Sequence, residues 1–214
     1  IFFYRDAPLP ESTVDESRRP IGEILRQPVV ILAIASAATA YGVMTFLMTA
    51  TPISMYEHAG HSLEATKWVI QSHIAGMYLP ALVFAGLVSR FGLKRMLWFG
   101  VAAYAVTLAV AAVDTRLLHY WLALVMLGIG WNFLFLGGTN LLPRGYSRSE
   151  RFRVQSVNDF LIFSVQAIVA LGSGWFLLHA GWSGVLLAAT LPVLAFTCLL
   201  LVSQVFRAPG AQGT

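Results

Sequence analysis

The chain has 214 residues, of which 57% are hydrophobic and 11% are charged, with 14 basic and 10 acidic side chains. Soluble domains average about 45–50% apolar and about 25% charged residues, so this composition excludes a water-soluble enzyme and a disordered tail. The single cysteine, Cys198, also excludes a secreted domain that is held together by disulfides.

The first 28 residues are predicted to precede the membrane domain. Residues 1–4 are apolar and lead into Arg5, as at the cytoplasmic end of a membrane helix. Residues 5–27 are rich in Pro, Glu, Ser and Arg, which is typical of a cytoplasmic linker, and a short surface helix is expected within 18–27, before Pro28. With no signal-peptide pattern at the start, we expect this chain to be the C-terminal part of a longer protein.

Six apolar runs follow, and each has the length of a membrane-spanning helix. A helix needs about 20 residues to cross a hydrocarbon core about 30 Å thick, whereas the strands of a membrane barrel are about ten residues long. We therefore expect an all-α membrane protein with a short cytoplasmic tail over 206–214. Its six transmembrane helices are predicted at about 29–50, 68–88, 96–113, 120–142, 154–178 and 182–205.

The basic residues favour one side of these runs. Twelve of the 14 lie on one side, namely Arg5, Arg18, Arg19, Arg26, Arg90, Lys94, Arg95, Arg144, Arg148, Arg151, Arg153 and Arg207. Only Lys67 and Arg116 lie on the other. By the positive-inside rule we expect the side with twelve basic residues, which includes both ends of the chain, to be cytoplasmic. The net charge of +4 is then explained by membrane orientation, so we expect a lipid bilayer and no nucleic acid as partner.

The turn after the second run resembles the cytoplasmic-loop signature of the major facilitator superfamily, Gly-x-Leu-x-Asp-Arg-x-Gly-Arg-Lys-Arg. Five residues match it: Leu87, Arg90, Gly92, Lys94 and Arg95. Ser89 stands at the acidic position. A second region, which includes Gly128–Phe133, Gly137–Thr139 and Glu150–Asp159, is similar to bacterial members of the same superfamily.

This resemblance implies a transporter of two six-helix halves with its site near the membrane midplane, between the halves. The chain would be the second half, in a bacterial inner membrane, and its partners would be the missing N-terminal half, a small-molecule substrate and protons. The first, second, fourth and fifth spans would face the pathway.

Polar residues inside the runs are the candidates for that pathway. In the fifth run, Gln155, Asp159 and Gln166 lie within about 40° of one line on a helix, and such a stripe is expected to face protein or a wet cavity. Asp159 is the only acidic residue within a run, so it is a candidate for proton coupling or substrate contact. The alternative is a structural ion pair with Arg151, Arg153 or another arginine of the preceding loop.

Other runs contribute weaker candidates. In the fourth run Asn132 and Thr139 share a face, where they bind substrate or tie helices together. In the first run Tyr41 is a candidate.

The second run carries candidates on two faces, and Pro80 is expected to bend it. Gln71 and Tyr78 share one face, and His73 lies about 200° away, so at least one set is structural. His73 is either part of a proton path or a hydrogen-bonded packing residue.

No motif indicates catalysis or a cofactor. An ATP-binding Gly-x-x-x-x-Gly-Lys-Ser/Thr loop and hydrolase motifs are absent, and the loop with Glu57, His58, His61 and Glu64 is interpreted as solvated and not as a metal site. We therefore predict the C-terminal half of a secondary active, proton-coupled solute transporter with no enzymatic activity, cofactor or metal. The alternatives are a six-helix membrane scaffold or binding module and, last, an intramembrane enzyme.

Overall fold

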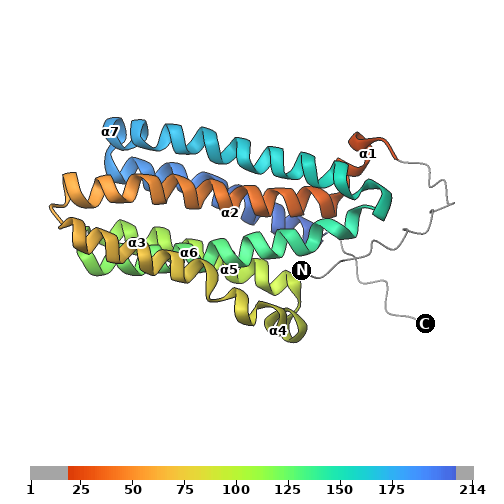
Figure 1. The fold of residues 1–214 in the computed structure, drawn as a ribbon, viewed down its shortest axis with the longest axis horizontal. Helices are drawn as coiled ribbons and strands as arrows, with labels where there is room; N and C mark the ends of the chain where they lie inside the picture. Colours follow the sequence, from red (N-terminus) through yellow and green to blue (C-terminus); the bar gives the residue numbers. More distant parts are fainter. Residues whose placement is uncertain (1–18, 206–214) are drawn as a thin grey trace, which may run out of the picture.

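The computed structural model describes residues 19–205, and within that range every regular element is a helix. The helices are α1 (Ile21–Leu25), α2 (Pro28–Ile53), α3 (Leu63–Tyr78), α4 (Ala81–Phe91), α5 (Leu93–Val113), α6 (Leu117–Leu141) and α7 (Arg151–Val205). Three short turns, η1 (Ser54–His58), η2 (Leu142–Gly145) and η3 (Arg148–Glu150), connect some of them. The long helices lie side by side in an elongated bundle (Figure 1). The short helix expected before Pro28 is present as α1, while the predictions for 1–18 and 206–214 lie outside the described residues.

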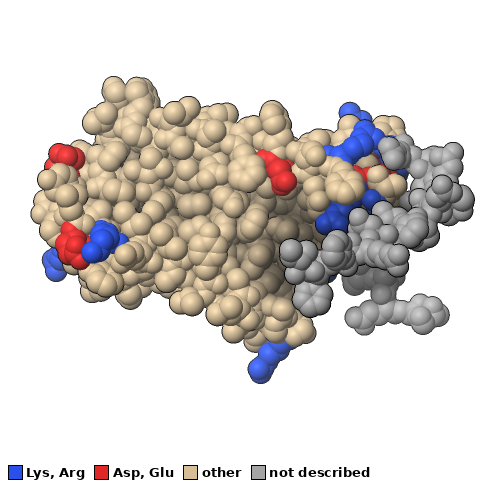
Figure 2. All heavy atoms as spheres, in the orientation of Figure 1, with Lys and Arg blue, Asp and Glu red and all other residues tan. Residues whose placement is uncertain are grey.

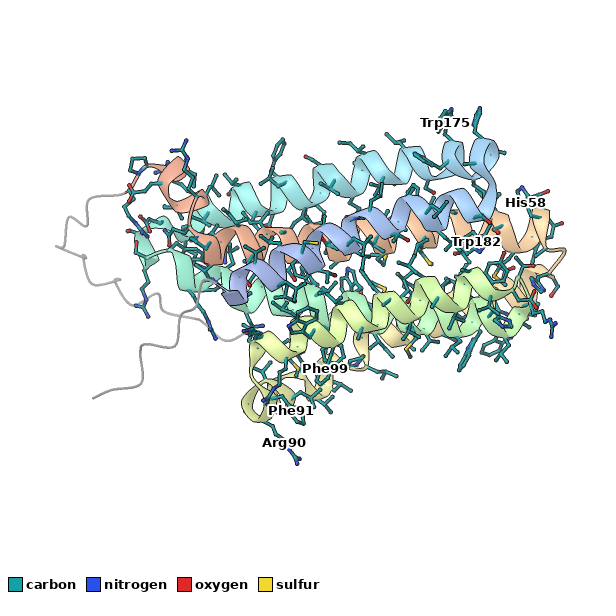
Figure 3. The ribbon with its side chains drawn as sticks, turned by 180° about the vertical axis from the view of Figure 1, so that it is seen from behind. His58, Arg90, Phe91, Phe99, Trp175 and Trp182 are labelled. Atoms are coloured by element: carbon teal, nitrogen blue, oxygen red, sulfur yellow. The ribbon has the colours of Figure 1, made fainter. Side chains whose placement is uncertain are left out.

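Helix α7 is a hairpin of two arms. Gly181 has φ 64° and ψ −175°, a conformation that is essentially restricted to glycine, and the chain reverses there. The first arm, 151–180, and the second arm, 182–205, run beside each other along the bundle (Figure 1). On either side of the reversal, Trp175 points away from the bundle, and Trp182 points inward and donates from Nε1 to the Ala111 carbonyl at 3.1 Å (Figure 3).

The second apolar run is broken, as expected, at Pro80. Proline lacks the N–H for the helical hydrogen bond and its ring clashes with the preceding turn, so α3 ends at Tyr78 and α4 begins at Ala81. The two helices are bent by 42°. Helix α4 leans away from the bundle (Figure 1), and Leu82 is 82% exposed.

Several helices are long and apolar enough to cross a membrane. Four stretches satisfy this by length and hydropathy: Pro28–His58, Leu93–Val113, Leu117–Gly145 and Arg148–Ser203. The bent pair α3–α4 adds a fifth if it is counted as one span. The predicted fifth and sixth runs lie in the two arms of α7. These helices indicate a multi-pass membrane protein.

Helix α6 packs against α2, α3 and α5, and glycines allow two of its closest approaches. A Cβ on Gly128 would lie 2.5 Å from the His73 carbonyl oxygen of α3, and one on Gly138 would lie 2.7 Å from the Ala33 carbonyl oxygen of α2. Both distances are shorter than any ordinary contact, so only glycine permits these helix backbones to approach so closely.

Charged side chains gather at the ends of the bundle. Figure 2 shows the basic groups concentrated at the end that carries α1, with a smaller mixed group at the opposite end. The broad middle of this face is almost entirely uncharged.

Candidate functional site

A polar cleft of about 250 Å³ lies between α2, α6 and the start of α7. It brings together three of the predicted site residues, Thr139 from α6 and Gln155 and Asp159 from the first arm of α7. The remaining lining residues are Ala37, Phe135, Leu142, Tyr146 and Asn158. Gln166 lies about two turns further along the same arm, half-buried and outside this lining.

Hydrogen bonds organise the cleft around α7. Gln155 donates from Nε2 to the Tyr146 hydroxyl at 3.2 Å, and its Oε1 accepts from Arg151 Nε at 3.4 Å. Asn158 donates from Nδ2 to Asp159 Oδ1 at 3.0 Å. Among residues 19–205 no ion pair includes Asp159, so the arginine partner considered as an alternative is not seen there. The carboxylate therefore keeps free lone pairs for a ligand or a proton.

Aromatic rings from four helices lie beside the cleft. Tyr41 of α2 contacts Trp131 and Phe135 of α6 edge-on, at centroid distances of 5.3 and 5.2 Å. Trp131 and Phe135 are stacked at 5.1 Å. Tyr78 of α3 approaches Trp131 at 6.1 Å, and Phe163 of α7 approaches Tyr41 at 6.0 Å. We call these five residues the aromatic wall; Phe135 belongs to both the wall and the cleft.

The two faces of α3 have different surroundings. His73 and Met77 are buried against the bundle, whereas Gln71 and Tyr78 are exposed. His73 donates from Nδ1 to the Leu124 carbonyl of α6 at 2.8 Å. His73 therefore makes a hydrogen-bonded contact between helices, and the Gln71–Tyr78 face is the exposed one.

Asn132, the residue after Trp131, makes a similar contact between helices. It is 2% exposed and donates from Nδ2 to the Met77 carbonyl at 2.7 Å. Three buried polar atoms in this part of the described structure have no hydrogen-bond partner: Asn132 Oδ1, Trp131 Nε1 and His73 Nε2. Such atoms are costly to leave unpaired, so this region holds capacity for a polar ligand or water.

The predicted loop signature connects α4 to α5 through Gly92, whose φ is 80°. Figure 3 shows Arg90 pointing away from the bundle, while Phe91 and Phe99 lie near each other, 6.2 Å apart. Ser89, at the acidic position of the signature, donates to the Gly86 carbonyl at 2.8 Å. Within the described residues Arg90, Lys94 and Arg95 make no ion pair, so this turn carries no charged latch there.

Two of the histidines and acids around the turn from α2 to α3 make separate contacts. Glu64 pairs with Lys67 at 2.6 Å, and the His61 ring donates to the Thr115 carbonyl at 2.8 Å. Across residues 19–205, no three His, Cys, Asp or Glu side chains are arranged to hold a metal ion.

Five polar or aromatic residues of this surface were not among the predicted site residues: Trp131, Phe135, Tyr146, Asn158 and Phe163. The sequence could have indicated Asn158, because it is a polar residue within an apolar run beside Asp159. It could not have indicated the aromatic residues, since an aromatic ring in an apolar run fits a lipid contact or core packing equally well.

Comparison with known proteins adds independent information. Residues 1–213 match the Major Facilitator Superfamily. A riboflavin transporter, RfnT, of Brucella anthropi is 37% identical over 171 residues, which cover 80% of this chain and 43% of that protein. An uncharacterized MFS-type transporter, YddS, of Bacillus subtilis is 32% identical over 97% of this chain and 50% of its own length. Monocarboxylate transporter 11 of the mouse is 30% identical over 74% of this chain and 35% of its own length.

The chain spans about half the length of the curated relatives it matches. These relatives are transporters and not enzymes, in agreement with the sequence motifs. The match over nearly the whole chain, the all-helical fold and the apolar helices agree that the chain belongs to the major facilitator superfamily of membrane transport proteins.

Proposed function

We propose that this chain is the second six-helix half of a secondary active transporter for a small organic solute. Six spans result when α3–α4 is taken as one broken span and the two arms of α7 are counted separately. Relatives of about twice its length support a missing first half. The six-helix face that includes the cleft and the aromatic wall would then form one side of a pathway between the halves.

The observation that carries this proposal is Asp159. It is a carboxylate within an apolar run, in a polar cleft, without an ion-pair partner among the described residues. An ionisable group at such a position is costly and is kept for function. Protonation would neutralise it, so one proton can be taken up on one side and released on the other as the halves rock. The basic end of the bundle would lie in the cytoplasm of a bacterial cell, next to the inner membrane.

The test is Asp159→Asn in the complete transporter, reconstituted in proteoliposomes. Riboflavin is the first solute to assay, because one relative bears that name. We expect the rate of uptake driven by an imposed pH gradient to fall by about tenfold or more, which corresponds to a barrier higher by at least about 1.4 kcal/mol. Solute exchange without a gradient should continue, because it needs no net proton movement.

Glu57→Gln is the matched control, since Glu57 is exposed in the loop after α2 and should leave gradient-driven uptake unchanged. Equal gradient-driven uptake by the wild type and the Asp159→Asn variant would contradict proton coupling at this residue. A complete protein that binds solutes but moves none would instead indicate the membrane scaffold or binding module.

A further inference from the structure

We propose that the solute is a flat aromatic compound with a hydroxylated tail. Its ring would lie on the aromatic wall and its tail would enter the polar cleft. This inference rests on the proposed function, because it takes the same surface to be the solute pathway.

The aromatic wall lies at the wrong depth for a lipid contact. Tyrosines that face lipid concentrate at the membrane interfaces, where the hydroxyl reaches water. Tyr41 and Tyr78 lie instead near the middle of the first and second apolar runs, and Tyr78 is 61% exposed. Phe163, whose ring lies 6.0 Å from that of Tyr41, is 56% exposed. Rings that are exposed at this depth suit a flat π-system, which pairs with them by stacking or edge contact.

Trp131 adds an observation that points independently to a ligand. Its side chain is 4% exposed, and its Nε1 donor has no partner among the described residues. A buried indole N–H usually finds an acceptor. A ring with carbonyl or nitrogen acceptors, as in a heterocycle, would supply one after a small rotation of the neighbouring rings.

The wall and the cleft are continuous through Phe135. This ring is stacked on Trp131 at 5.1 Å and also lines the cleft with Thr139 and Asp159. The cleft volume of about 250 Å³ is below the range of about 300–1,000 Å³ for sites that enclose a whole drug-sized ligand. The cleft therefore accommodates part of a solute while another part remains on the wall.

The polar groups of the cleft suit a hydroxylated tail. Asp159 would repel an anionic tail inside the cleft. Hydroxyl groups donate to the Asp159 carboxylate and accept from the amides of Gln155 and Asn158.

The experiment uses three probes on the complete purified transporter: riboflavin, with ring and hydroxylated tail; lumichrome, with the ring alone; and ribitol, with the tail alone. Binding is followed by fluorescence quenching for the two flavins and by competition with riboflavin for ribitol. We expect riboflavin to bind about tenfold or more tightly than lumichrome, and ribitol not to compete at millimolar concentration.

Variants separate the two parts of the site. Phe163→Ala should weaken riboflavin and lumichrome binding alike by about tenfold, because both use the wall. Asn158→Ala should weaken riboflavin binding and leave lumichrome binding unchanged. Phe152→Ala is the matched control, because Phe152 is 79% exposed on the same arm but belongs to neither the wall nor the cleft.

The outcomes distinguish this inference from the proposed function. If the transporter exchanges sugars, amino acids or monocarboxylates across proteoliposomes but neither binds nor moves flavins, the inference is overturned and the proposed function stands. The same holds if flavin binding is unaffected by Phe163→Ala. If no solute in the exchange screen is moved, the proposed function itself fails.

Discussion

Glu150 joins the segment before α1 to the start of α7. Its carboxylate is nearly buried and accepts from the Arg19 Nε and Nη2 atoms at 2.9 and 2.7 Å. It also accepts from the Ser147 backbone N–H at 2.8 Å, in a capping box that begins η3. These hydrogen bonds, that from Arg19 first, lower the pKa of Glu150 from 4.5 to about 2, and the same contact raises the pKa of Arg19.

This pKa shift predicts an acid-sensitive contact. Because the folded pKa lies below the unfolded one, the contact stabilises the fold fully above about pH 4.5 and is lost as the pH falls toward 2. We expect the melting temperature of the detergent-solubilised protein to fall more steeply between pH 5 and pH 3 in the wild type than in Glu150→Gln. Glu23→Gln, at an exposed residue of α1, is the control and should follow the wild type. Parallel curves for all three proteins would contradict this role of Glu150.

Gly128 lies where the backbones of α3 and α6 approach each other closely. A Cβ there would meet the His73 carbonyl oxygen at 2.5 Å and the Met77 amide nitrogen at 2.8 Å, and backbone atoms cannot rotate away. Gly128→Ala should therefore force α3 and α6 apart and destabilise the protein by about 1–3 kcal/mol, measured by denaturant titration. Gly174→Ala, with no atom within 4 Å of the new Cβ, should be neutral. Equal stability of the two variants would show that the α3–α6 contact is looser than described.

At the scale of elements, two breaks shape the bundle. Pro80 ends α3 and redirects α4, so that the exposed Tyr78 lies at the break, beside Trp131. Gly181 reverses α7, so that its first arm carries the cleft residues and its second arm returns along the bundle. One break depends on a missing N–H and the other on a missing Cβ.

The role of Gly181 in the reversal of α7 can be tested with two glycine-to-alanine variants. Gly181→Ala places a Cβ at φ 64°, ψ −175°, where residues other than glycine are strained by about 1–3 kcal/mol. We expect the free energy of unfolding, measured in mixed micelles, to fall by the same amount. Gly172→Ala, on the first arm and with open space around the new Cβ, should be neutral or slightly stabilising, since alanine favours a helix over glycine. A neutral Gly181→Ala would show that the reversal tolerates another backbone conformation.

At the scale of the whole molecule, the charges are asymmetric along the bundle axis. Of the arginines that the structure describes, most lie at the end with α1, η2 and η3, and the opposite end carries Lys67 and Arg116, each paired with a nearby acid. Such an asymmetry orients membrane proteins with the basic end in the cytoplasm.

Cysteine labelling measures this orientation. In a Cys198→Ser background, Ser89→Cys and Thr115→Cys each place one thiol at an exposed position, in the last turn of α4 and in the loop between α5 and α6, on opposite sides of the predicted membrane. We expect a membrane-impermeant maleimide added to intact cells to label the Thr115→Cys protein, and to label the Ser89→Cys protein only after the membrane is opened. The reverse pattern would invert the proposed topology.

The sequence by itself determined the class of protein, the apolar runs and the asymmetry of charge. These follow from composition and from the order of residues, because a helix in hydrocarbon satisfies its own backbone and needs only a long enough apolar run. It also indicated the bend at Pro80, and it placed Gln155 and Asp159 on one stripe of a helix. Within one helix, spacing alone decides which residues share a face.

Only the tertiary structure decided which residues meet across helices. It buried His73 against α6 and left Gln71 and Tyr78 exposed, although the spacing had allowed either face of α3 to be open. It also joined Tyr41, Trp131 and Phe163 from three helices into one aromatic wall, and placed Thr139 beside Asp159. The physical reason is that helix packing depends on the rotation and approach of each helix, which side-chain volumes and glycines such as Gly128 set jointly across the bundle.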